Sequence, residues 1–154
     1  PVDADPNFIS DGGYPVKNLY ELLNSMNTKS TTVVIDACFS GRSEKGMIIR
    51  NVSPVLLRVD NNNLNGENSA LLTSSTNEQL SSWYPEKQHS LFTYYFLKAI
   101  QGEADLNNDK KIMIDEIEIY IDENVPYKAR QLNGQVQTPQ INALNKNRVF
   151  VNYK

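Results

Sequence analysis

The only cysteine in the sequence, Cys38, stands where a strand would deliver a nucleophile. The preceding run Thr31–Ile35 is rich in residues that favour β-structure, and a serine and a glycine follow soon after the cysteine. A thiol at the carboxyl end of a buried strand is held on a rigid support, which is where open α/β sheets place their chemistry. Alternatively, Cys38 is a small buried hydrophobe, as most free cysteines are. The neighbouring Asp36 and the Ser-Gly pair favour the nucleophile.

Asp36 lies two residues before Cys38, so on a continuous strand the two side chains share a face. An unpaired carboxylate beside a thiolate would raise the pKa of the thiol and weaken the nucleophile. We therefore expect Asp36 to form the floor of a pocket that accepts a basic group, not to activate Cys38. The alternative is a structural carboxylate that accepts backbone N–H groups at the end of the strand.

Three stretches of sequence resemble a known family. Residues 33–41 read VVIDACFSG and resemble the nucleophile strand of the caspase-like cysteine peptidases, especially bacterial caspase homologues and metacaspases, which have Asp-x-Cys-x-Ser-Gly there. Residues 71–97 resemble the strand, substrate-binding loop and long helix of the caspase small subunit. Residues 1–6 look like the segment after the catalytic His-Gly of bacterial members. The likeness covers nearly all 154 residues in the right order.

The resemblance implies an α/β fold of the caspase-like (caspase-haemoglobinase) type, a three-layer sandwich. It also implies a cysteine endopeptidase that acts on peptide or protein substrates and needs no cofactor for its chemistry. Cys38 would be the nucleophile, and backbone N–H groups, including its own, would hold the oxyanion. The residues that would bind substrate are Asp36, Ser74, Ser82 and Trp83.

The expected specificity differs from that of caspases. Asp36 stands where caspases have glutamine, and Tyr84 follows Ser82-Trp83 where caspases have an arginine that helps to hold an acidic side chain. Both differences point away from cleavage after aspartate and towards cleavage after arginine or lysine, as in metacaspases. Trp83 could instead be a packing residue.

The general base of the family has no counterpart here. It is a histidine in a Gly-His-Gly-like turn before the cysteine strand, whereas the only histidine, His89, lies about fifty residues after Cys38. We expect His89 to be a surface or packing residue at the start of a helix. The chain is then the carboxyl-terminal part of a catalytic domain, inactive unless the missing amino-terminal part joins it. The alternative is a non-catalytic caspase-like module used for binding or regulation.

Patterning predicts helices over residues 15–27, 87–101 and 115–132, the last disturbed by Pro126, and strands over 31–38, 69–75 and 148–153. The first helix has an apolar stripe that we expect in the core: Leu19, Leu22, Leu23 and Met26. Strands that alternate with helices indicate a sheet of parallel type, here with one edge lacking its amino-terminal strands. Residues 42–68 resemble the linker between caspase subunits, either a self-processing segment or a plain solvated loop.

Composition is that of a single domain over residues 1–154, with 40% hydrophobic and 21% charged residues. The net charge of −3 offers no basic footprint for nucleic acid. No apolar run approaches the ~18 residues of a membrane span, and no signal peptide is apparent. A single cysteine excludes an internal disulfide and suits a reducing compartment. We therefore expect a cytoplasmic protein that binds neither nucleic acid nor membrane.

Residues 105–116 have the spacing of a calcium-binding EF-hand loop. The expected oxygen ligands, at positions 1, 3, 5, 7 and 12, are Asp105, Asn107, Asp109, the Lys111 carbonyl and Glu116. Position 6 is Lys110 where the motif has glycine, and a left-handed turn there costs roughly 1–2 kcal/mol. The sequence leaves two possibilities open, a Ca2+ site or a connector that has only the shape of one.

Overall fold

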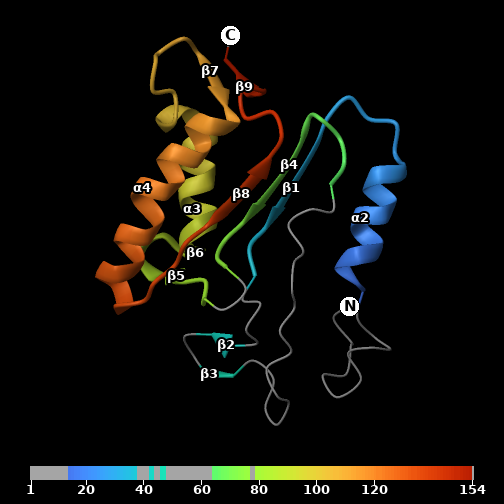
Figure 1. Ribbon diagram of the computed structural model, residues 1–154. Coiled ribbons are helices and arrows are strands. Elements are labelled where there is room, and N and C mark those ends of the chain that lie inside the picture. Colours follow the sequence, from blue (N-terminus) through green and yellow to red (C-terminus); the bar gives the residue numbers. More distant parts are fainter. Residues whose placement is uncertain (1–13, 38–41, 44–45, 48–63, 77–78, 154) are drawn as a thin grey trace.

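The computed structural model describes residues 14–37, 42–43, 46–47, 64–76 and 79–153 (Figure 1). Cys38 and most of the 42–68 segment lie outside these residues. The helices, turns and strands are, in chain order, α2 (Val16–Ser25), β1 (Thr31–Ile35), β2 (Arg42–Ser43), β3 (Gly46–Met47), β4 (Ser69–Thr73), β5 (Trp83–Tyr84), η2 (Pro85–Lys87), β6 (His89–Ser90), α3 (Leu91–Lys98), η3 (Ala99–Glu103), β7 (Lys111–Met113), α4 (Ile114–Asn133), β8 (Gln140–Ala143) and β9 (Val149–Asn152).

The central sheet consists of β1, β4 and β8, with β4 in the middle. β4 runs parallel to β1, with Val33 opposite Leu71, and antiparallel to β8, with Leu72 opposite Ile141. The prediction of a parallel-type sheet is confirmed for β1 and β4 but fails for β8, a strand that the sequence analysis did not anticipate. The expected last strand exists as β9, but it pairs with β7 and does not join this sheet.

Helices cover both faces of this sheet (Figure 1). Successive side chains of β4 point to opposite faces, so each face offers apolar residues to a helix. Leu71 packs with Tyr20 of α2 on one face. Ala70 and Leu72 point to the other face and join the main core formed with α3 and α4. The sheet is therefore packed between two helix layers. Because β1 and β4 are parallel, their carboxyl ends lie at the same edge of the sheet.

The core face of α2 differs from the predicted stripe. Leu22 and Met26 are 55% and 51% exposed, whereas Tyr20 is 2% exposed and packs on Leu71. Val16 joins this contact, so the helix turns the Val16–Tyr20 side to the sheet. The predicted core position of Leu22 and Met26 was wrong.

The second predicted helix begins four residues late, at Leu91. Pro85–Lys87 form a 3-10 turn, Gln88 has a left-handed φ of 54°, and β5 and β6 pair around this turn as a short hairpin. The helix then passes into the wide turn Ala99–Glu103, where Gly102 has a φ of 123° that glycine adopts most readily.

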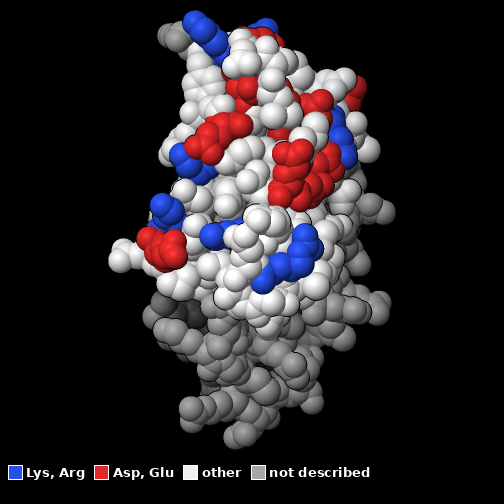
Figure 2. All heavy atoms as spheres, turned by 90° about the vertical axis from the view of Figure 1, so that its left-hand side faces the viewer, with Lys and Arg blue, Asp and Glu red and all other residues white. Residues whose placement is uncertain are grey.

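Helix α4 continues through Pro126, contrary to the expected disturbance. Its buried residues recur every three or four positions, and Val125 and Ala129 on either side of the proline are both fully buried. Packing of this apolar face stabilises the helix despite the missing N–H of the proline. The acidic residues of α4 lie in its first half, which suits the helix dipole. Figure 2 shows the side of the molecule on which α4 lies, and acidic side chains gather on the upper part of that surface. In the described part of the chain no helix has the length and apolar character needed to cross a membrane.

Candidate active site

Asp36 follows β1 directly, and its carboxylate is held by hydroxyl groups from two later segments. Ser81 Oγ donates to Oδ1 at 2.9 Å. Oδ2 accepts from the Ser90 hydroxyl, from Thr93 Oγ1 at 2.5 Å and from the Thr93 backbone N–H at 3.2 Å. Thr93 lies in the first turn of α3, where a negative charge is favourable. The carboxylate thus joins the end of β1 to the start of α3.

The strand β1 ends at Ile35, one residue before Asp36. The predicted strand over residues 31–38 is therefore shorter than expected, and the argument that Asp36 and Cys38 share a strand face does not apply as stated. Asp36 lies outside the strand, so its direction is set by the hydroxyl groups around it and not by strand alternation.

Ser74 fixes the chain immediately before Cys38. It is fully buried at the end of β4, and its N–H donates to the Ile35 carbonyl at 3.0 Å. Its Oγ accepts from the Ala37 N–H and donates to the Ala37 carbonyl, both at 3.3 Å. The residue next to Cys38 is therefore tied to the neighbouring strand through a side chain as well as through the backbone.

Ser82 and Trp83 lie beside this network. Ser82 is 1% exposed, and its carbonyl accepts from the Leu91 N–H at 2.8 Å. Trp83 is 49% exposed and is paired in the hairpin with Ser90, the residue that donates to Asp36. Ser90 thus links the half-exposed tryptophan to the Asp36 carboxylate, and the indole can form part of a substrate-binding surface there.

The four described residues that sequence analysis selected for substrate binding therefore meet at one edge of the sheet. Sequence analysis missed the groups that hold them: Ser81, Ser90, Thr93 and Gln137. Ser90 and Thr93 have a helix-start spacing, which could have indicated a capping role. Nothing in the spacing showed that both would turn to Asp36.

The only histidine lies in β6, opposite Tyr84, and is exposed. This position agrees with the surface location expected for His89. Its side chain lies in a hairpin that follows the substrate-binding segment, not in a turn that precedes the cysteine.

The Asp105–Glu116 loop has the turn that its spacing requires. Lys110 at position 6 adopts a left-handed φ of 65° despite its side chain. Asp105 Oδ1 and Asn107 Oδ1 both accept from the Asp109 N–H, at 3.1 and 2.8 Å, and Asp109 Oδ1 accepts from the Lys111 N–H at 2.8 Å. The side-chain oxygens thus turn into the loop and bind its own amides.

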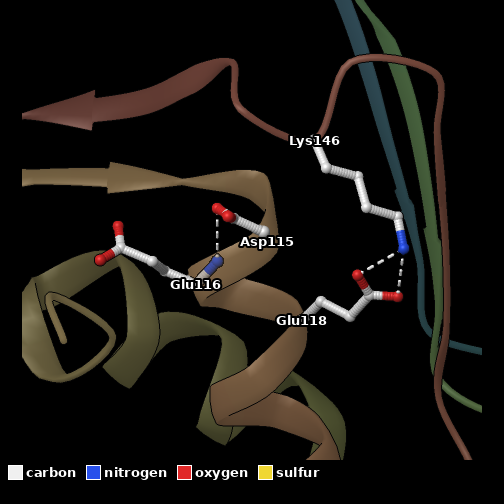
Figure 3. A network of polar contacts seen from close by, with 4 residues as sticks. All are labelled: Asp115, Glu116, Glu118 and Lys146. Atoms are coloured by element: carbon white, nitrogen blue, oxygen red, sulfur yellow. Dashed lines mark hydrogen bonds and ion pairs between the residues drawn. The ribbon is translucent and has the colours of Figure 1, made fainter.

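Glu116, at position 12, also turns to the loop. Its carboxylate accepts from the Leu106 N–H at 3.3 Å and from the Met113 N–H at 2.9 Å. In Figure 3 it points away from Glu118, whose carboxylate binds Lys146. Among the described residues, no three His, Cys, Asp or Glu side chains are grouped so that they could hold a metal ion. The loop has the backbone shape of a calcium site, while its oxygens satisfy backbone amides.

Most of the chain is similar to a known peptidase family. Residues 9–151 match the sequence model of peptidase family C14, which is described as the caspase domain. No curated protein and no solved structure was found to match the chain.

Proposed function

We propose a cysteine endopeptidase function for this chain, which belongs to the caspase domain family. In this proposal Cys38 is the nucleophile and the substrate carries arginine or lysine before the bond that is cleaved. The observation that carries the proposal is the Asp36 carboxylate, which is held by hydroxyl groups beside the half-exposed Trp83 and two residues from Cys38.

The charge and acceptor capacity of Asp36 support a basic substrate. Three of its four donors converge on Oδ2, while Oδ1 accepts from Ser81 alone in the contacts above. We infer that an ammonium or guanidinium group of the substrate approaches Oδ1, which has fewer donors than Oδ2 among the described residues. A substrate carboxylate would be repelled at the same place.

The chemical step is acyl transfer. The Cys38 thiolate attacks the carbonyl carbon, the C–N bond breaks, and the amine leaves with a proton from the general acid. Water then adds to the thioester carbonyl, the C–S bond breaks, and the carboxylic acid product leaves as the thiol is restored. Residues 1–37 contain no histidine, and His89 is exposed in the β5–β6 hairpin. We therefore assign the base to a segment of the protein outside residues 1–154, as the family resemblance implies.

The finer features of the fold belong to the same proposal. Within the described residues β4 is the one strand that pairs with β1, so the other edge of β1 is the place where further strands of a three-layer caspase-like sandwich would add. The segment over 42–68 would be the inter-subunit linker. We place the protein in the cytoplasm and assign a structural Ca2+ to the Asp105–Glu116 loop, with no part in the chemistry.

A panel of fluorogenic peptides tests the proposal. The peptides differ only in the residue before the cleaved bond, which is arginine, lysine, aspartate or citrulline, a neutral analogue of arginine. The protein that contains this chain together with its histidine-bearing segment should cleave the arginine and lysine peptides and leave the other two nearly intact. Preferred cleavage after aspartate, or no cleavage of any peptide, would refute it.

A further inference from the structure

Gln137 is a fully buried polar side chain that lies behind the site described above and contacts its residues. It lies in the segment between the end of α4 and β8, and its exposed fraction is 0%. A buried amide is costly unless its donors and acceptor are satisfied. Its three partners all belong to the segment that leads from β4 to the β5–β6 hairpin.

The direction of this amide is fixed by its neighbours. The Ser82 backbone N–H can only donate, and it binds Gln137 Oε1 at 2.8 Å. The Ser74 carbonyl can only accept, and it accepts a hydrogen bond from Gln137 Nε2 at 2.9 Å. The reversed amide would set two donors against each other at Ser82 and two acceptors at Ser74. Gln137 therefore holds a single orientation that joins the end of β4 to the start of β5.

The same nitrogen lies 3.5 Å from Ser81 Oγ, the hydroxyl that donates to Asp36. A hydroxyl that accepts from Gln137 directs its own proton elsewhere, and Asp36 Oδ1 lies at 2.9 Å. One buried side chain thus contacts both residues that precede Trp83.

A second pair of contacts ties the same two segments together. The Thr138 N–H donates to Gln79 Oε1 at 2.7 Å, and Gln79 Nε2 donates to Thr138 Oγ1 at 3.2 Å. Gln79 is only half-buried. The segment 79–83 is therefore attached to residues 137 and 138 at two points, one in the core and one near the surface.

We propose that Gln137 is a positioning residue for the substrate-binding segment Ser81–Trp83, which its buried amide holds against the carboxyl ends of β1 and β4. The inference rests on the proposed function, since it assigns to that segment the binding of substrate beside Asp36. Gln137 touches neither the substrate nor the reacting atoms, so its effect must appear in substrate binding and not in the chemical step.

The experiment compares the complete protein with its Gln137→Met variant, which keeps the length of the side chain but removes its hydrogen bonds. KM for the arginine peptide should rise about five- to tenfold, the size expected for one or two hydrogen bonds, while kcat per titrated active site stays within about twofold. Amide hydrogen exchange in residues 79–84 should become faster. Gln131→Met, on the exposed end of α4, is the matched control and should change none of these.

Gln79→Ala removes the surface tie and provides a second variant if Gln137→Met fails to fold. It should raise KM in the same direction by a smaller factor. An unchanged KM in a folded variant, or a loss confined to kcat, would overturn the role of Gln137 and leave the peptidase proposal intact. If the parent protein cleaves no peptide although the amides of residues 79–84 exchange slowly, as in a folded segment, both the peptidase proposal and the role of Gln137 are overturned.

Discussion

Replacement of Asp36 by asparagine separates the charge of this residue from its structural contacts. Asparagine keeps one acceptor oxygen, which can face Ser90 and the two donors of Thr93. Its amide nitrogen then takes the place of Oδ1, and the Ser81 hydroxyl must turn to accept. One hydrogen bond is reversed and none is lost, but all four become contacts with a neutral group, so the free energy of unfolding should fall by about 1–3 kcal/mol.

The loss in activity should depend on the charge of the substrate. A hydrogen bond to a charged group is worth about 1.5–3 kcal/mol, and each 1.4 kcal/mol is a factor of ten. Asp36→Asn should therefore lower kcat/KM for the arginine peptide by about 10- to 150-fold. The citrulline peptide carries no charge, and its kcat/KM should fall by a smaller factor, about two- to twelvefold, the scale of a neutral hydrogen bond.

The assay measures kcat/KM for both peptides with the complete protein, and thermal melting reports the folded state. Asp122→Asn removes a carboxylate from an exposed position on α4 and serves as the control for net charge. Asp36→Ala should reduce both stability and activity, because it also removes the acceptor at the start of α3. If Asp36→Asn keeps the parent ratio of arginine to citrulline cleavage, Asp36 is a structural carboxylate and the pocket argument is wrong.

Three further predictions concern other parts of the chain. Cys38→Ala in the complete protein should abolish peptide cleavage and leave the melting temperature nearly unchanged; residual turnover would exclude Cys38 as the nucleophile. Millimolar calcium should raise the melting temperature if the Asp105–Glu116 loop binds it, and Glu116→Gln should erase that shift. The shift is the quantity to compare, because Glu116 also accepts two backbone N–H groups and its replacement lowers the starting value. Hydrogen bonds from Lys98 and Tyr120 hold the pKa of Glu103 below its ordinary value of 4.5, so the destabilisation by Glu103→Gln should be present above that pH and vanish as the pH falls through the lowered pKa; an equal effect at pH 3 and pH 7 would contradict it.

The elements predicted best from sequence were those with a strong local signal. Thr31–Ile35 is a dense β-favouring run, and it forms the strand β1. β8 was missed because Gln140–Ala143 contains only one strongly apolar residue, Ile141, and is a strand through its pairing with β4. Two apolar stripes of α2 share Leu19 and Leu23: one includes Leu22 and Met26, and the other includes Val16 and Tyr20. Only the packing of Tyr20 on Leu71 selects the second.

The site was predicted in part for the same reason. Asp36, Ser82 and Trp83 could be selected because a family motif places them in order along the chain. Each supporting group lies 45 to 57 positions along the chain from the residue that it holds. A serine, a threonine or a glutamine at such a distance has no signature in sequence. Its partner is chosen by the packing of α3 and β8 on the sheet.

Helix α4 separates the two sites that the sequence suggested. The Asp105–Glu116 loop lies at its start, and Gln137 follows its end. A helix of 20 residues is about 30 Å long, so an ion in the loop would lie far from the segment that contains Gln137. Bound calcium would act on the β7–β9 pair and on the first turn of α4, which are contacts of the fold and not of the pocket. We therefore expect calcium to raise the melting temperature without changing KM for the arginine peptide. A calcium-dependent KM that Gln137→Met abolishes would contradict this separation and would mean that α4 transmits the state of the loop to the substrate-binding segment.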